Sequence, residues 1–257
     1  MDLQLKGKRA LVTGGSKGIG KACAQVLAEE GCAVTIVSRD GAALAAAAAD
    51  IRAKTGVEVQ WQAADLSQRG VAEALAAGAG ELDILVNNAG AIPGGDIFKV
   101  DEDTWRRAWD LKVFGYVNLT RAVYARMKER RSGVIVNVLG NAGEKLNAAY
   151  IAGSTGNAGL MAFTRALGGV STVDGIRMVG VSPGPVATER LLSLTKQMAA
   201  AKLGDASRYE EMFKGMAYDR PATPEEIAWT VAFVASPRSS YTSGVYFSVD
   251  GGLAAKS

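Results

Sequence analysis

The chain has 257 residues, of which 48% are hydrophobic and 21% are charged; this suits one sizeable folded domain and excludes an intrinsically disordered chain. Its net charge of +3 is close to balance, so the charge gives no reason to expect nucleic acid or an anionic membrane as a partner. It contains no histidine, which excludes imidazole catalysis, Ser-His-Asp or Cys-His nucleophiles and histidine-ligated metal, and we expect no metal site.

Short runs of β-branched residues alternate with longer segments rich in alanine and leucine along the whole chain. The runs predict strands at 9–13, 33–38, 57–62, 84–87, 134–138, 177–182 and 245–249. The longer segments predict helices at 18–30, 41–54, 68–77, 102–129, 150–168 and 224–235. Most of the strands are continuous apolar runs, which is typical of strands covered by helices on both faces. The alternation therefore predicts an α/β fold, a doubly wound parallel sheet of about seven strands.

No linker or shift in composition divides the chain, so we expect a single domain over residues 1–257. Residues 186–220 depart from the alternation of strand and helix, and they follow the sixth strand. Segments at the carboxyl ends of parallel strands surround the ligand in such sheets, which favours a substrate lid; a surface pair of helices is the alternative. The sequence has no apolar run approaching 18 residues and no visible targeting segment, so a cytoplasmic location is the default expectation.

A glycine-rich segment, TGGSKGIG at 13–20, joins the first strand to the first helix. Glycines permit a tight turn and a close approach of the backbone to a pyrophosphate, and the helix N-terminus offers N–H groups and a positive dipole end. The motif is weak alone, but the strand before it and the helix after it supply the context that a dinucleotide site needs.

Four further motifs occur in order along the chain. They are Asp65-Leu66, NNAG at 87–90, SPGPVAT at 182–188 and VDGG at 249–252. Together with the glycine loop, they resemble the motifs of the short-chain dehydrogenase/reductase family over nearly the whole chain. The resemblance implies a Rossmann-type fold, a nicotinamide dinucleotide, a small-molecule substrate and a homo-oligomer, either a tetramer or a dimer.

The family resemblance also implies which positions contact the cofactor. The glycine loop would bind the pyrophosphate, and the segment after the third strand would contact the adenine. The segment after the fourth strand would line the adenosine ribose side, and the segment after the sixth would hold the nicotinamide. The positions carried over are Gly14, Ser16, Gly18, Ile19, Gly20, Asp65, Leu66, Asn87, Ala89, Gly90, Pro183, Gly184, Val186 and Thr188.

The end of the second strand predicts the choice between NAD and NADP. NAD-binding proteins place an acidic residue there for the ribose 2′-hydroxyl, whereas this chain has Ser38 followed by Arg39. A guanidinium binds a 2′-phosphate through paired, charged hydrogen bonds, and Lys17 in the glycine loop adds a second cation. The residues favour NADP(H) over NAD(H); two solvated surface cations are the alternative.

The catalytic positions depart from the family pattern, which uses Asn, Ser, Tyr and Lys. The segment 158–167 resembles the one that follows the family lysine, and this register puts Asn157 at the lysine position and Gly153 at the tyrosine position. Gly140 then stands at the serine position and Lys112 at the asparagine position. All four usual residues are absent in this register, and the two glycines predict an emptied pocket able to admit a bulkier substrate.

The candidate catalytic residues are consequently Tyr150, Lys112 and Asn157. Tyr150 precedes Gly153 by three residues, so on a helix its phenol would lean into the vacated space, with Lys112 lowering its pKa. Asn157 could bind a ribose hydroxyl without charge. The alternative is that Tyr150 packs as an aromatic at the helix start. Glu144 and Lys145 are a second proton source or an exposed pair.

Three functional hypotheses remain. The first is an NADP(H)-dependent oxidoreductase that transfers hydride between nicotinamide and a carbonyl or alcohol through a non-standard proton site. The second is a catalytically degenerate NADP(H)-binding sensor or partner subunit, which the loss of four usual residues favours more than a single loss would. The third, a non-redox enzyme with a structural nucleotide, has no residue that supports it. We expect an enzyme of the first kind.

Overall fold

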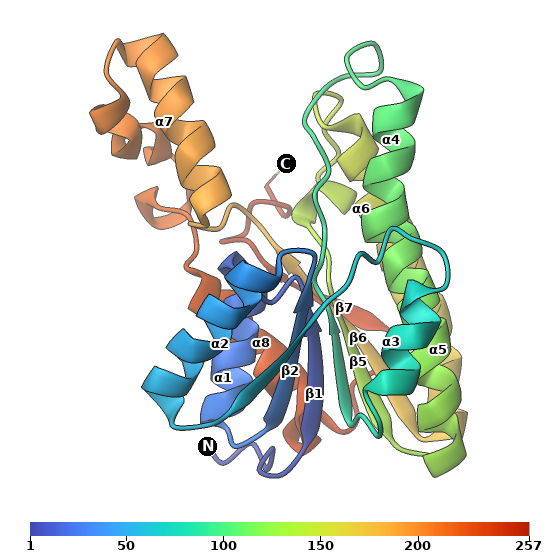
Figure 1. Cartoon of the computed structure of the whole chain (residues 1–257). Coiled ribbons are helices and arrows are strands. Elements are labelled where there is room, and N and C mark those ends of the chain that lie inside the picture. Colours follow the sequence, from blue (N-terminus) through green and yellow to red (C-terminus); the bar gives the residue numbers. More distant parts are fainter. Residues whose placement is uncertain (257) are drawn as a thin grey trace.

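The computed structural model describes residues 1–256, so the last position of the predicted domain, residue 257, lies outside the described residues. Seven strands form one parallel sheet in the order β3-β2-β1-β4-β5-β6-β7 (Figure 1). The strands are β1 (Arg9–Thr13), β2 (Ala33–Ser38), β3 (Val59–Ala63), β4 (Ile84–Asn87), β5 (Gly133–Val138), β6 (Ile176–Pro183) and β7 (Val245–Val249). The predicted Rossmann-type α/β fold is confirmed.

Helices cover both faces of the sheet (Figure 1). They are α1 (Gly18–Glu29), α2 (Gly41–Thr55), α3 (Val71–Gly78), α4 (Glu102–Trp109), α5 (Gly115–Arg130), α6 (Ile151–Val170), α7 (Glu189–Leu203) and α8 (Pro224–Ala235). One large apolar cluster joins the sheet to α1, α2 and α8, and a second joins it to α3 and α5. Burial on both faces explains why the strands read as apolar runs.

The single helix predicted over 102–129 is interrupted in the structure. Residues Asp110–Phe114 form a π-helical segment between α4 and α5. Such one-turn bulges inside α-helices occur frequently at functional sites, and Lys112 lies inside this one. The helix predicted to start at residue 68 begins at Val71 instead, because Gly70 has a φ of 81° and closes a turn.

Residues 186–220 fold into a helical hairpin that rises beyond the carboxyl end of the sheet (Figure 1). It contains α7 and two 3₁₀ segments, Ala206–Phe213 and Ala217–Asp219. A narrow stem joins it to the sheet, where the Ala187 N–H donates to the Ala222 carbonyl at 2.8 Å and the Ala222 N–H donates to Pro185 at 2.9 Å.

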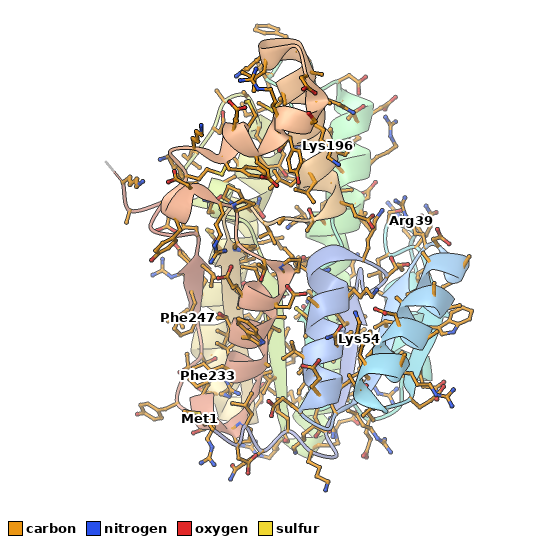
Figure 2. All side chains as sticks on the ribbon, turned by 90° about the vertical axis from the view of Figure 1, so that its left-hand side faces the viewer. Met1, Arg39, Lys54, Lys196, Phe233 and Phe247 are labelled. Atoms are coloured by element: carbon orange, nitrogen blue, oxygen red, sulfur yellow. The ribbon has the colours of Figure 1, made fainter. Side chains whose placement is uncertain are left out.

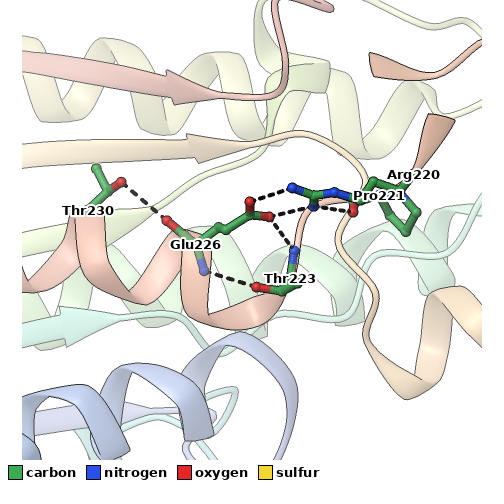
Figure 3. Close-up of polar contacts among 5 residues, drawn as sticks. All are labelled: Arg220, Pro221, Thr223, Glu226 and Thr230. Atoms are coloured by element: carbon green, nitrogen blue, oxygen red, sulfur yellow. Dashed lines mark hydrogen bonds and ion pairs between the residues drawn. The ribbon is translucent and has the colours of Figure 1, made fainter. Parts of the chain in front are cut away.

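The far side of this stem is fixed to the start of α8 (Figure 3). Arg220 donates to both carboxylate oxygens of Glu226, at 2.7 and 2.8 Å. Glu226 also accepts from the Thr223 N–H, while the Thr223 hydroxyl accepts from the Glu226 N–H, which completes a capping box. None of the helices formed by residues 1–256 is both long and apolar enough to cross a membrane.

Candidate active site

A cleft of about 660 Å³ opens along the carboxyl ends of the central strands. This is where ligands bind in open parallel sheets, at the point where the strand order reverses between β1 and β4. Of the residues predicted to bind the cofactor or to act in catalysis, those that line it are Gly14, Ser16, Lys17, Gly18, Ile19, Ser38, Arg39, Leu66, Ala89, Gly90, Lys112 and Thr188.

The glycine loop leaves room for a ligand at the start of α1. Gly14 and Gly18 have φ angles of 67° and 56°, which side chains rarely adopt. A β-carbon on Gly20 would lie 2.3 Å from the Gly14 carbonyl oxygen, so this glycine serves the close packing of helix on loop. No side chain caps α1, and its first N–H groups remain available to a phosphate. These residues fit the pyrophosphate of a dinucleotide.

The end of β2 carries the residues that bear on the 2′-position of the adenosine ribose. Ser38 and Arg39 line the cleft, and Lys17 lines it from the glycine loop. Arg39 forms no ion pair within residues 1–256, so its guanidinium is free for an external anion. Figure 2 shows Arg39 at the edge of the molecule beside α2. Asp40 also lines the cleft, and its carboxylate caps α2 by accepting from the Ala43 N–H.

Several of the predicted cofactor residues do not line the cleft. Asn87 is fully buried and donates to Thr120 and Asn137, and Asp65 accepts from Ser67. The others are Gly20, Pro183, Gly184 and Val186. The neighbouring Asn88 does line the cleft, and its amide donates to the Thr13 carbonyl at 3.0 Å. The sequence contained it within the NNAG motif, but only the register of β4 shows which of the two asparagines faces outward.

Lys112 crosses the floor of the cleft from the π-helical segment. Its Nζ donates to the Val138 carbonyl at 3.5 Å, at the last residue of β5, and to the Leu139 carbonyl at 3.2 Å, one residue further. A β-carbon on Gly90 would lie 2.6 Å from its Cδ, so that glycine makes room for the side chain. Burial, with a smaller effect from the positive charge of Arg190, lowers the pKa of Lys112 to about 8.

Tyr150 stands at the N-cap position of α6 without a side-chain capping bond, and it does not line the cleft; its ring lies against Gly153. A β-carbon on Gly153 would lie 2.1 Å from ring carbons of Tyr150. The phenol hydroxyl makes no hydrogen bond within residues 1–256, whereas the ring packs in an apolar cluster with Ile92 and Ala152. The expectation that its pKa would fall is wrong, because burial raises the pKa and the charge of Arg190 offsets this only in part.

Asn157 is buried, with 3% of its surface exposed, and it does not line the cleft. Its amide nitrogen donates to the Gly153 carbonyl at 2.9 Å, and its Oδ1 has no partner. A β-carbon on Gly140 would lie 3.0 Å from this amide nitrogen. The expected emptied pocket is therefore wrong, because Tyr150 fills the space at Gly153 and Asn157 fills the space at Gly140.

The loop after β5 is tied to the C-terminal segment. Glu144 accepts from the Ser248 hydroxyl at 3.0 Å, and Lys145 donates to the Leu253 carbonyl at 3.2 Å. The amide of Asn141 donates to Asp250 at 3.5 Å. Glu144 and Lys145 therefore position this loop and do not form a pair with each other.

The two cysteines and the metal prediction concern parts of the chain outside the cleft. Cys23 and Cys32 are buried, and burial raises the pKa of each to about 12, as expected of unreactive thiols. Within residues 1–256 no group of three or more Cys, Asp or Glu side chains is arranged to hold a metal ion.

Comparison with known proteins places this geometry in a family. The model of the short chain dehydrogenase family matches residues 8–199. The 3-oxoacyl-[acyl-carrier-protein] reductase FabG of Chlamydia muridarum is 33% identical over 258 residues, covering 99% of this chain and all of the relative.

Two solved structures are similar over the same length. L-sorbose reductase from Gluconobacter frateurii, complexed with NADPH and L-sorbose, has a TM-score of 0.94 at 30% identity and covers 100% of both chains. An NAD⁺-bound xylitol dehydrogenase has a TM-score of 0.87 at 27% identity, covering 97% of this chain and 100% of its own. The cleft, the glycine loop and these matches agree, and the chain belongs to the short-chain dehydrogenase family as an oxidoreductase of that type.

Proposed function

We propose that the chain is an NADP(H)-dependent carbonyl reductase in which Tyr150 and Lys112 form the proton site. The observation that carries the proposal is the position of the Tyr150 ring, which occupies the space of a side chain on Gly153 and leaves its hydroxyl without a partner. Gly153 is the position at which the family resemblance expects the catalytic tyrosine. A phenol from the preceding turn thus replaces one that the sequence lacks there.

The preference for NADP(H) rests on Arg39. The similar structures do not decide the matter, because one contains NADPH and another NAD⁺. Ser38 cannot repel a 2′-phosphate, and the unpaired Arg39 with Lys17 offers it two cations. When bound, the reduced nicotinamide supplies a hydride to the carbonyl carbon of the substrate.

Residues of the protein then stabilise the negative charge that develops on the carbonyl oxygen and supply its proton. In the proposed mechanism the Tyr150 hydroxyl donates a hydrogen bond to the carbonyl oxygen and passes it a proton as negative charge develops there. Its raised pKa keeps the phenol protonated in the resting protein. The Lys112 ammonium, held by two carbonyl oxygens, stabilises the developing alkoxide. Asn157 acts as a positioning residue, since it bonds the Gly153 carbonyl beneath the tyrosine.

The decisive experiment separates cofactor binding from turnover. We expect NADPH binding by the wild type and oxidation of NADPH in a panel of ketones, aldehydes, quinones and enones. Tyr150→Phe and Lys112→Met should each lower kcat by a factor of about 10²–10⁴ with NADPH affinity unchanged. Tyr241→Phe, a change at a fully exposed tyrosine, is the control. Binding without turnover across the panel would instead support the sensor or partner subunit.

We propose that residues 186–220 act as a lid over one domain, because their hairpin stands on a narrow stem beside the cleft.

We also propose a homo-oligomer. Exposed aromatic side chains gather on α8 and β7, among them Trp229, Phe233 and Phe247, which are 59%, 39% and 38% exposed. Figure 2 shows Phe233 and Phe247 on the same side of the molecule.

A further inference from the structure

Arg190, the second residue of α7, reaches back across the cleft from the base of the hairpin. Its Nη2 donates to the Ile92 carbonyl at 2.8 Å, on the loop that follows β4. Ile92 belongs to the apolar cluster against which Tyr150 packs. Arg190 and Lys112 both line the cleft. The guanidinium is thereby held in the cleft next to the apolar cluster against which the Tyr150 ring packs, although Tyr150 itself does not line the cleft.

The charge of Arg190 is not neutralised by the protein. No carboxylate within residues 1–256 lies within 4.0 Å of its guanidinium nitrogens. Glu189 also lines the cleft but forms no ion pair with it. Arg190 is close enough for its positive charge to add to the burial effect that lowers the pKa of Lys112 and to offset part of the rise that burial causes in the pKa of Tyr150. This end of the cleft therefore presents two cations, Lys112 and Arg190, to whatever enters it.

We propose that Arg190 is a specificity-determining residue that binds a carboxylate, so that the substrate is an oxo acid and not a neutral ketone. The inference rests on the proposed function for the carbonyl that is reduced, and it adds the second group of the substrate. One N–H of the guanidinium is fixed by Ile92, and the others remain to form paired hydrogen bonds with a carboxylate. A neutral analogue would leave the guanidinium of Arg190 without an anionic partner once the analogue fills the cleft. The site would therefore discriminate in favour of the acid.

A phosphate of the cofactor is the other anion that an arginine in this cleft could bind. The loop that fits the pyrophosphate carries Lys17, and its Gly14 N–H donates to the Val37 carbonyl at 2.7 Å, at the end of β2 where Arg39 follows. Arg190 is instead tied to Ile92, on the side of Tyr150. Its placement favours the substrate, and the experiment has separate arms for the two anions.

The test measures binding, so it does not depend on turnover. Calorimetry would follow the titration of three matched pairs into the protein saturated with NADP⁺. The pairs are pyruvate and methyl pyruvate, acetoacetate and methyl acetoacetate, and levulinate and methyl levulinate, which differ in the separation of carbonyl and carboxylate. We expect at least one acid to bind ten times more tightly than its ester. Arg190→Gln should abolish that preference, and Arg190→Lys should retain part of it.

Lys202→Gln is the matched control, since it removes one positive charge from the same helix outside the cleft and should leave the preference intact. NADP⁺ affinity is measured for every variant. The proposal is overturned if no acid is preferred by the wild type, or if Arg190→Gln weakens NADP⁺ binding and leaves the preference unchanged. An acid preference without any turnover would retain this site and contradict the proposed reductase.

Discussion

The ring of Tyr150 occupies the space that a side chain on Gly153 would need, because a β-carbon on the glycine would lie 2.1 Å from the ring. The relationship makes the glycine a condition for the position of the phenol. A residue that looks like a loss in the sequence is, in the structure, what admits the proposed proton donor.

Gly153→Ala tests this relationship directly. The new methyl group must displace the Tyr150 ring from its apolar cluster, at a cost of about 1–3 kcal/mol in the free energy of unfolding. We expect a large loss of kcat, measured with the best substrate of the panel. Gly159→Ala is the matched control on the same helix, because a β-carbon there meets no atom within 4 Å. That variant should keep full activity and gain about 0.5–1 kcal/mol of stability. Full activity in Gly153→Ala would remove Tyr150 from the mechanism.

Arg39→Ser should weaken the binding of NADPH and leave that of NADH unchanged. A hydrogen bond to a charged group contributes about 1.5–3 kcal/mol, which corresponds to a tenfold or greater rise in Kd for NADPH. Fluorescence titration with both cofactors measures it. Lys54→Gln removes a charge from the adjacent helix, far from the cleft, and should change neither Kd. Equal effects on NADPH and NADH would contradict the assignment of the 2′-phosphate to Arg39.

The reduction rate should depend on pH through Lys112. Its pKa is lowered to about 8, so the ammonium is complete below that pH and is lost above it. If the ammonium stabilises the alkoxide, kcat falls as the pH rises through 8. Lys112→Arg keeps its charge over the whole range. In this variant the fall near pH 8 should disappear even if the rate is lower. A decline that persists unchanged in Lys112→Arg would assign it to another group.

Glu226 should make stability depend on pH in the acid range. The Arg220 guanidinium, with the Thr223 N–H, lowers the pKa of Glu226 to about 2 in the folded chain, below its usual 4.5. The contribution of the ionised Glu226 to the free energy of unfolding is therefore complete above pH 4.5 and is lost as the pH falls toward 2. Glu226→Ala should cost about 0.5–2 kcal/mol of unfolding free energy at pH 7, because the capping box is lost.

Hydrogen exchange in residues 189–219 should rise in Arg220→Gln, and an unchanged pattern would mean that the Arg220–Glu226 pair does not hold the hairpin.

Trp229→Glu should reduce the mass of the protein in solution if α8 and β7 cover a second copy. A carboxylate placed in an apolar contact remains unpaired when two copies meet, which disfavours association. Light scattering after size-exclusion chromatography reports the mass. Trp61→Glu, at a comparably exposed tryptophan on β3, is the control. A wild-type mass equal to that of one chain would end the proposal of a homo-oligomer.

The sequence predicted the sheet well because its signals are local. The apolar runs at β1, β2, β4 and β7 have the predicted bounds, and so does α8, whose start is capped by Thr223. The π-helical segment was not predictable, since its five residues carry the same periodicity as the helices around it. The sequence also could not show which side chains occupy the space beside Gly140 and Gly153. A glycine in place of a larger residue predicts an empty space, and only the positions of Tyr150 and Asn157 show that this space is filled.

The ties between the loop at 141–145 and the segment from Ser248 to Leu253 have a practical consequence for handling the protein. The C-terminus emerges close to the carboxyl end of the sheet, whereas Met1 lies at the opposite end (Figure 1). A purification tag fused at the C-terminus would load the segment that is hydrogen-bonded to the loop after β5. Recombinant protein for kinetic work should therefore carry its tag before Met1.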